Sequence, residues 1–419
     1  MAIDLITFGC RLNALEGEVM KKRAEEAGFG DLIMINTCAV TAEAERQARQ
    51  KLRRIIRDNP GRRVVITGCS AQNSAANYAK IPGLFAILGN SDKMRPDTYR
   101  ALGLAAKNVG SAPAGPIVIL SEIEKHPSPP AISASRAPAK FDGWTKAFVQ
   151  VQQGCDNRCA YCVIPYLRGN SVSFSKASVF AQIEAALAGG YKEIALTGVD
   201  ISSYRAPSED GGIAGIAPLA RNILNAFPQL PRLRLHSLDP ARDYTELFEI
   251  MRENPRLMPH IHLSMQSGCD RTLRAMRRRH ISADLVSVAE NARAHVPHIG
   301  IGADIIVGFP GETDEDFAET LATVRLVKPS RLHVFPYSPR PGTSAAALEN
   351  QLPADIKKSR AKALRIIGSE LEIEFVKSLK GQIRPVLVEE DGRGYTDNFV
   401  MVEFKDADHE PGAIVDYTF

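Results

Sequence analysis

Three cysteines lie in one short run of this 419-residue chain, at Cys155, Cys159 and Cys162. Cysteine thiolates at short, fixed spacings hold iron–sulfur clusters. Three thiolates bind three irons of a 4Fe–4S cube and leave the fourth iron open to a small molecule. The spacing therefore predicts a site for chemistry and not for electron storage alone. The alternatives are a zinc loop, which would need four protein ligands if structural, or three unrelated thiols.

Three more cysteines, Cys10, Cys38 and Cys69, each follow a short apolar run of strand type. Helix-like segments at 15–27 and 43–58 separate these runs, a pattern typical of a parallel sheet with crossover helices. The carboxyl ends of parallel strands share one edge of the sheet, where ligands bind. We therefore expect the three thiols to converge on a second cluster site with one open iron. Buried apolar cysteines are the alternative.

The length of the chain predicts two or three domains of the α/β class. Residues 1–108 are expected to form a doubly wound parallel-sheet domain, and the proline-rich stretch 109–143 a linker with a candidate strand at 117–120. Residues 144–378 repeat the strand–helix alternation six times and end in a helical extension. This predicts a partial, TIM-like (βα)6 barrel with its chemistry at the carboxyl ends of the strands. Residues 379–419 predict a small β-barrel.

The composition, 44% hydrophobic and 24% charged, is that of a soluble globular protein. No apolar run approaches the length of a membrane span, and the N-terminus lacks a signal-peptide pattern. These features predict a cytoplasmic protein with no membrane partner. Seven cysteines in such a chain favour metal or catalytic ligands over disulfides. The net charge of +4 only slightly favours a polyanionic partner.

The CxxxCxxC run at the mouth of a partial βα barrel resembles the radical S-adenosylmethionine (SAM) superfamily. The N-terminal triplet makes the chain similar to the methylthiotransferases of that superfamily, over essentially its whole length. Their motifs are resembled by TFGCRLN, NTCAVT, TGCSAQ, GCDNRCAYCVIPYLRG, LSMQSGCDRTLRAMRR, DIIVGFPGET and FPYSPRPGT. The C-terminal module resembles a TRAM domain, an RNA-binding module. GCRLN followed by NTCAVTAEAERQARQ most resembles the branch that acts on threonylcarbamoyladenosine in tRNA.

The resemblance implies an enzyme that methylthiolates C2 of N6-threonylcarbamoyladenosine at position 37 of tRNA, next to the anticodon. The loop cysteines would hold the 4Fe–4S cluster that binds SAM and generates a radical. The N-terminal cysteines would hold an auxiliary 4Fe–4S cluster that carries sulfur. Two SAM molecules per turnover are implied, with a reductant such as flavodoxin or ferredoxin and a sulfur donor as partners, and no DNA. No protein acid or base is proposed, because the hard chemistry belongs to the cofactors.

Residues at the ends of the predicted barrel strands are the expected SAM contacts. They are Gly198, Ser264, Gln266, Asp304, Ile306 and Gly308. Gly198 allows close backbone approach or simply ends a strand. Ser264 and Gln266 alternate on one strand and are either ligands or satisfied polar groups of the core. Asp304 would be costly to bury without a partner, which favours a functional contact.

Arginines are the expected substrate contacts, because basic patches bind phosphates regardless of sequence. They are Arg46, Arg49, Arg53, Arg277 and Arg278, with Arg168 after the cysteine loop as a fork for a carboxylate or phosphate. Solvated helix faces are the alternative interpretation. Residues 379–419 carry four basic and nine acidic side chains, so this module cannot bind tRNA by bulk charge. Tyr395 and Phe399 could instead stack bases.

Two other functions remain open at this point. The same chemistry could act on N6-isopentenyladenosine in tRNA or on an aspartate of a ribosomal protein. A non-catalytic iron–sulfur sensor that binds RNA belongs to a different class. The sensor would bind tRNA without cleaving SAM, whereas an enzyme would form 5′-deoxyadenosine under reducing conditions.

Overall fold

The computed structural model describes residues 3–39, 41–108, 115–123, 138, 141, 143–207, 211–404 and 409–419. By its internal contacts the chain divides into two compact units. The first comprises Met1–Phe141, Gln150–Asn157 and Cys162–Ala186, and the second Asp142–Val149, Arg158–Tyr161 and Leu187–Phe419. The predicted boundaries instead ran consecutively along the chain. In the described part of the chain, no helix combines the length and apolarity needed to cross a bilayer.

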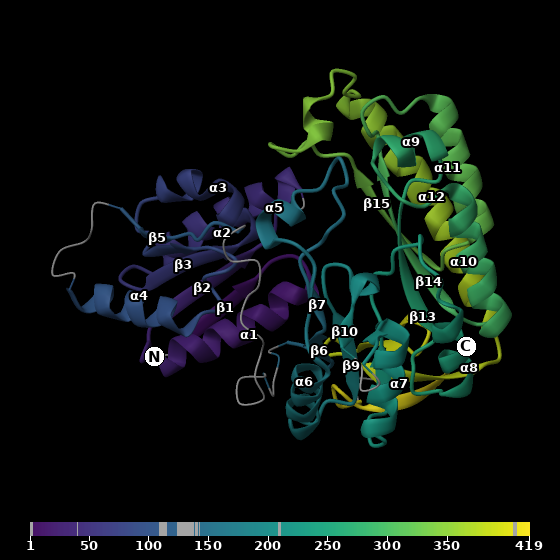
Figure 1. Cartoon of the computed structure of the whole chain (residues 1–419), viewed down its shortest axis with the longest axis horizontal. Coiled ribbons are helices and arrows are strands. Elements are labelled where there is room, and N and C mark those ends of the chain that lie inside the picture. The colour runs from purple at the N-terminus through teal and green to yellow at the C-terminus, as the bar shows by residue number, and fades with distance from the viewer. Residues whose placement is uncertain are drawn as a thin grey trace. The chain divides into compact units, whose positions relative to one another are not determined.

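A five-stranded sheet organises the first unit (Figure 1). Its strands, in spatial order, are β1 (Ile3–Thr7), β2 (Leu32–Thr37), β3 (Arg63–Gly68), β4 (Ala86–Leu88) and β5 (Ile117–Ile119). All four pairings are parallel, as the alternation of apolar runs and helices predicted. Strand β5 lies within the segment expected to be a linker and pairs with β4. The sheet therefore extends further along the chain than residue 108.

Helices cover both faces of this sheet, which confirms the doubly wound arrangement (Figure 1). They are α1 (Arg11–Glu26), α2 (Ala42–Asp58), α3 (Cys69–Ala79) and α4 (Pro96–Asn108). Ile35 and Ile66 of the sheet pack against Leu52 of α2 and Tyr78 of α3. Helices α1 and α4 contact each other on the opposite face. Because both faces are covered, every residue of β2 is buried.

Six strands form the barrel-like part of the second unit, as predicted. They are β6 (Ala147–Gln150), β9 (Glu193–Thr197), β12 (Arg232–Arg234), β13 (His260–Gln266), β14 (Gly300–Val307) and β15 (Arg331–Pro336). They form two sheets, β12-β9-β6 and β13-β14-β15. Parallel bridges from Leu233 to Leu257 and from Leu238 to Leu263 join the two sheets. The curved row of strands therefore has one carboxyl edge.

Helices alternate with these strands, and a long helix follows the last one (Figure 1). They are α6 (Lys176–Ala188), α7 (Ile216–Ala226), α8 (Thr245–Glu253), α9 (Asp270–Ala275), α10 (Ser282–His295), α11 (Asp314–Val327) and α12 (Ala354–Ser378). Short elements line the loops: β7 (Gln152–Gln153), α5 (Ile164–Arg168), β8 (Val172–Ser173), η2 (Ile201–Ser203), β10 (Ala206–Pro207), β11 (Ile213–Ala214) and η3 (Ser344–Ala347).

The C-terminal module is a four-stranded antiparallel sheet in the order β18-β17-β16-β19. The strands are β16 (Ile383–Val388), β17 (Arg393–Thr396), β18 (Met401–Glu403) and β19 (Ile414–Thr418). Among the described residues β18 and β19 do not pair, so the expected small barrel has the form of an open sheet.

Buried charges attach this module to the barrel strands within the second unit. Glu193 on β9 accepts hydrogen bonds from Arg232 Nε at 2.6 Å and Arg234 Nε at 2.8 Å. Arg232 also donates to the carbonyl of Pro385 at 3.1 Å, and both arginines donate to the carbonyl of Thr396. Because the three side chains are almost fully buried, this ion-paired group fixes the position of the C-terminal sheet.

The aromatic side chains expected to stack bases are half-buried and stack on each other. The rings of Tyr395 and Phe399 stack on each other with centroids 4.7 Å apart. Lys146 Nζ lies 5.0 Å from the Tyr395 ring, and the Phe399 ring lies 4.9 Å from the Arg234 guanidinium and 4.6 Å from the His260 ring. Both rings therefore have protein partners, and base stacking by them stays a prediction.

Candidate iron–sulfur sites

The N-terminal cysteines follow three neighbouring parallel strands, so they lie at one edge of the sheet. Cys10 comes directly before α1, Cys38 follows β2, and Cys69 is the first residue of α3. Gly9 has a φ of +95°, and a Cβ at this position would lie 2.9 Å from the Cys38 sulfur. Only glycine therefore leaves room for the Cys38 side chain beside the backbone that precedes Cys10.

The surroundings of Cys69 fit an iron–sulfur ligand. Its sulfur accepts hydrogen bonds from Arg168 Nε at 3.3 Å and Asn90 Nδ2 at 3.5 Å. Hydrogen bonds to cysteine sulfurs are a means by which proteins tune iron–sulfur clusters. In the described residues, no three His, Cys, Asp or Glu side chains stand close enough together to hold a metal ion.

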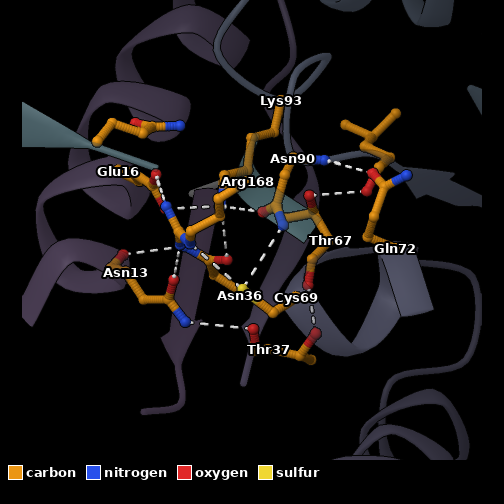
Figure 2. A network of polar contacts seen from close by, with 12 residues as sticks. Asn13, Glu16, Asn36, Thr37, Thr67, Cys69, Gln72, Asn90, Lys93 and Arg168 are labelled. Atoms are coloured by element: carbon orange, nitrogen blue, oxygen red, sulfur yellow. Dashed lines mark hydrogen bonds and ion pairs between the residues drawn. The ribbon is translucent and has the colours of Figure 1, made fainter. Parts of the chain in front are cut away.

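A buried polar network surrounds the Cys69 sulfur (Figure 2). Arg168 donates to both carboxylate oxygens of Glu16 at 2.7 and 3.0 Å and to Asn13 Oδ1 at 2.8 Å. Lys93 Nζ lies 2.6 Å from Glu16 Oε2. Burial alone raises the pKa of Glu16, but the charges of Arg168 and Lys93 outweigh it and lower the pKa to about 2. Glu16 is therefore a carboxylate that neutralises one of two buried cations.

Amide side chains extend this network across the strand ends. Asn13 Nδ2 donates to the carbonyl of Thr37 at 3.2 Å, and Asn36 Nδ2 donates to the carbonyl of Asn13 at 2.9 Å. Lys93 Nζ donates to Asn90 Oδ1 at 2.8 Å and to Asn36 Oδ1 at 3.3 Å. The network thus connects the backbone that follows β1 and β2 to the segment that follows β4 (Figure 2).

Arg168, predicted to contact substrate, lies within the buried network around Cys69. The residue is only 3% exposed, and its Nε, Nη1 and Nη2 all donate to protein atoms. It ends the short helix α5, whose Leu167 packs with Val163 against Cys69. The sequence signal for this arrangement was the position of Arg168 six residues after Cys162, within the same short segment.

A glycine shapes the start of the CxxxCxxC loop. Gly154 has a φ of +69°, and a Cβ there would lie 1.9 Å from the carbonyl oxygen of Asn170. The Cys155 N–H donates to the carbonyl of Gly169 at 3.0 Å. The backbone at 154–155 therefore lies directly against the backbone at 169–170, with no space for a side chain at position 154.

Cys159, in the second unit, accepts a hydrogen bond from an arginine. Arg278 Nη1 donates to the Cys159 sulfur at 3.4 Å and Nη2 to the carbonyl of Ser264 at 3.2 Å, while Asp239 lies 3.4 Å from Nη2. The side chain of Arg278, a predicted substrate contact, is only 7% exposed and has these protein partners. Its Nε is buried and has no hydrogen-bond partner among the described residues. The donor chemistry here also fits a thiolate-bound cluster.

The predicted SAM contacts on β13 lie beside this arginine. The carbonyl of Ser264 accepts the hydrogen bond from Arg278, and Gln266 has a left-handed φ of +66°. The pairing of β13 with β14 shifts register between Leu263 and Gln266. Such irregularities re-aim side chains next to active sites. A left-handed glutamine at the carboxyl end of a barrel strand is therefore consistent with a functional position.

Some of the remaining predicted SAM contacts already form hydrogen bonds or ion pairs with other protein groups. Gly198 directly follows β9 at the carboxyl edge. Asp304 accepts from His262 at 3.0 Å, and Ile306 packs beside Ala160 of the cysteine loop. The Gly308 N–H donates to the Glu312 carboxylate at 3.1 Å. Asp304 and Gly308 thus already have protein partners.

The other predicted RNA contacts occupy varied surroundings. Arg46 is exposed and makes a bidentate ion pair with Glu43 on α2. Arg53 is exposed on the same helix, and Arg49 is half-buried. Arg277 is exposed, with a left-handed φ of +58°. Of the predicted RNA contacts, Arg53 and Arg277 are thus exposed and form no ion pair with an acid in the described part of the chain.

Sequence reasoning missed a cavity at the carboxyl ends of β9 and β12. Its volume is about 570 Å³, and its charged lining comprises two arginines, Arg205 and Arg242, and two acids, Asp243 and Glu246. Arg242 Nε is buried without a hydrogen-bond partner among the described residues. Burial, and then the charge of Asp239, raise the pKa of nearby Asp200. No short motif marks this cavity, because its lining comes from separate loops.

Comparisons with known proteins agree with this architecture. A sequence model of the Radical SAM superfamily matches residues 149–324, and one described as Uncharacterized protein family UPF0004 matches residues 2–89. The threonylcarbamoyladenosine tRNA methylthiotransferase MtaB of Rickettsia prowazekii is 38% identical over 96% of this chain and 90% of its own. The tRNA-2-methylthio-N(6)-dimethylallyladenosine synthase of Corynebacterium glutamicum (strain ATCC 13032) is 32% identical over 93% of this chain and 75% of its own.

Among solved structures, the radical S-adenosylmethionine methyltransferase TsrM of Kitasatospora setae superposes with a TM-score of 0.62 at 16% identity. The match covers 83% of this chain and 77% of that chain. At this identity the likeness shows a shared fold.

A row of six barrel strands whose first strand leads into a CxxxCxxC loop defines a radical SAM enzyme. More particularly, the chain belongs to the radical SAM methylthiotransferase family, since it matches such relatives over nearly their whole length. Enzymes of this family use SAM and two 4Fe–4S clusters.

Proposed function

We propose that this enzyme methylthiolates C2 of N6-threonylcarbamoyladenosine at position 37 of tRNA. The observation that carries the proposal is the 38% identity to a relative named for this reaction, over 96% of the chain. The dimethylallyladenosine synthases match at up to 32% identity, so the competing substrate is less well supported. A reductant such as flavodoxin or ferredoxin and a sulfur donor are part of the proposal.

The two cysteine triplets are assigned to two clusters. Cys155, Cys159 and Cys162 hold the cluster that binds SAM, and the N-terminal triplet at the sheet edge holds the auxiliary cluster. When bound, these groups supply the radical and the sulfur that a carbon as inert as adenine C2 requires. The chain's own residues supply donors to the sulfurs: Arg278 at the loop triplet and Arg168 at the N-terminal triplet.

The cavity near β9 and β12 supports the threonylcarbamoyl substrate. That substituent ends in a carboxylate, whereas an isopentenyl group is apolar. Arg242 has a buried Nε without a partner in the described residues, and Arg205 also lines the cavity, together with the acids Asp243 and Glu246. A guanidinium fork binds a carboxylate well. An apolar substituent would leave this donor unpaired, at a cost of about 1–3 kcal/mol.

Mass spectrometry of tRNA nucleosides from a deletion strain tests the substrate. Loss of 2-methylthio-N6-threonylcarbamoyladenosine with normal 2-methylthio-N6-isopentenyladenosine is the expected result, and the reverse pattern would assign the other nucleoside. A strain in which neither changes would refute a tRNA substrate and leave a ribosomal aspartate. The purified, reduced protein should also form 5′-deoxyadenosine, whereas an RNA-binding sensor would not.

Substitution of Arg242 tests the cavity in the same assay. Complementation with Arg242→Leu should reduce methylthiolation of threonylcarbamoyladenosine at least tenfold, the equivalent of about 1.4 kcal/mol. Arg221→Leu is the matched control, because Arg221 is 44% exposed and pairs loosely with Glu246 and Glu253. Equal activity of the two variants would remove Arg242 from substrate recognition.

A further inference from the structure

The guanidinium of Arg168 is held rigidly against the sulfur of Cys69. Its Nη1 and Nη2 each donate a hydrogen bond to one carboxylate oxygen of Glu16, and Nη2 also donates to Asn13 Oδ1. With two of its nitrogens fixed in this way, the third, Nε, is directed at the Cys69 sulfur at 3.3 Å (Figure 2). A donor held by such outer partners keeps its geometry when the sulfur binds iron.

The charges beside this sulfur include a buried guanidinium. Arg168 is a cation that shares the carboxylate of Glu16 with Lys93, and burial lowers the pKa of Lys93. All three side chains are at most 2% exposed. A buried charge is costly unless an opposite charge compensates it. Thiolates at the sheet edge supply that negative charge, and a cluster bound to them would carry it permanently.

The same short segment places Arg168 relative to Cys69. Val163 and Leu167 pack with Cys69 and Ala39, and the Leu167 carbonyl accepts from Asn90 Nδ2 at 2.9 Å. Asn90 Nδ2 also lies 3.5 Å from the Cys69 sulfur. Helix α5 begins two residues after Cys162, so the segment that ends the CxxxCxxC loop delivers the donor to the N-terminal triplet.

We propose that Arg168 is a positioning residue that raises the reduction potential of the auxiliary cluster, through its hydrogen bond and charge at Cys69. This proposal rests on the proposed function, which assigns a cluster to the N-terminal cysteines. Reduction adds one electron to the cluster and makes its sulfurs more negative. A fixed N–H donor and the positive charge of the Arg168 guanidinium stabilise that form more than the oxidised one. Lys93 and Glu16 keep the guanidinium in place and do not themselves contact the sulfur in the structure.

The test uses the full-length chain with Cys155, Cys159 and Cys162 all replaced by alanine, termed the loop-cysteine variant. It retains only the N-terminal site. After anaerobic reconstitution, iron and sulfide content report whether a cluster binds, and a redox titration followed by electron paramagnetic resonance reports its potential. The variants Arg168→Gln and Arg168→Lys are then introduced into this background. Both leave the Lys93–Glu16 ion pair in place, which favours retention of the fold.

Arg168→Gln removes the charge and should lower the reduced fraction at a fixed potential at least tenfold, a shift of about 59 mV for one electron. Arg168→Lys keeps the charge and should shift the potential less. The control is Arg62→Gln, since Arg62 lies in the same unit and pairs with Asp4 and Asp31. The control should leave the potential unchanged.

An Arg168→Gln variant that binds its cluster at an unchanged potential would overturn the proposal. So would folded Arg168→Gln and Arg168→Lys proteins that both fail to bind iron, because Arg168 would then be structural. If the loop-cysteine variant itself bound no iron with Arg168 intact, the two-cluster function would fail instead. The two failures are therefore distinguishable.

Discussion

Replacement of Glu193 should release the C-terminal sheet from the barrel strands. Glu193 is the one carboxylate in contact with Arg232 and Arg234, among the ion pairs found in the described residues. Those two arginines in turn hold backbone carbonyls of the C-terminal module, at Pro385 and Thr396. Glu193→Gln preserves the size of the side chain but leaves two buried cations side by side.

The expected magnitude follows from burial. The side chains of Glu193, Arg232 and Arg234 are 2%, 3% and 0% exposed, so solvent does not screen them. Removing one partner of a buried ion pair costs about 3–5 kcal/mol. At ~1.4 kcal/mol per tenfold change, this corresponds to an increase of about 10²- to 4 × 10³-fold in opening of the attached sheet.

Hydrogen exchange measured by mass spectrometry checks this prediction. Amides of β16 and β17 should lose protection by that factor in Glu193→Gln, while β13 and β14 keep theirs. Arg221→Gln is the control, because exposed ion pairs contribute about 0–1 kcal/mol. Less than tenfold loss of protection at β16 and β17, or an equal loss throughout the second unit, would refute the reasoning.

Three further predictions concern the cysteine sites. Because the folded pKa of Glu16 is lowered from 4.5 to about 2, its ion pairs stabilise the fold fully above the unfolded pKa and lose that effect as the pH falls through this window. The contribution is about 3 kcal/mol by the relation between pKa shift and free energy. The free energy of unfolding, measured with urea at several acidic pH values, should therefore depend less on pH in Glu16→Gln than in the parent protein. The same pH dependence in both proteins would contradict the prediction. Gly154→Ala should disrupt the CxxxCxxC loop, because its Cβ would meet the Asn170 carbonyl at 1.9 Å; normal iron content would show that the loop tolerates it. Cys69→Ala and Cys159→Ala should each retain about half the iron of the parent protein, since each removes a ligand of one cluster. Full iron content in either variant would exclude that cysteine as a ligand.

Much of the fold followed from local pattern. The apolar runs that end at Cys10, Cys38 and Cys69 predicted parallel strands with their carboxyl ends together, because hydrophobic periodicity and strand–helix alternation leave few topologies. The six barrel strands and the helical extension that follows them were also predicted, and they correspond to the six strands and helix α12 of the second unit. Strand β5 was a candidate within the linker, but its place in the N-terminal sheet was not predicted, since its partner β4 lies across a helix and its flanks are rich in proline.

The arginines show where local pattern fails. Arg168 and Arg278 read as members of basic stretches, yet each is buried against a cysteine sulfur and an acid distant in sequence. Arg46, by contrast, lies on the exposed face of α2 as a charge run predicts. Sequence spacing distinguishes these cases poorly, because burial depends on which segments pack together and not on the neighbours of a residue along the chain.

The sequence by itself determined the six cysteines, the class of chemistry they permit and the barrel that carries the CxxxCxxC loop. These follow from residue type and spacing, which are local properties. Only the tertiary structure decided which groups surround the sulfurs: Arg168 and Asn90 at Cys69, and Arg278 at Cys159. The strength and charge of those contacts arise from burial among segments up to 119 residues apart, and no local pattern records such a distance.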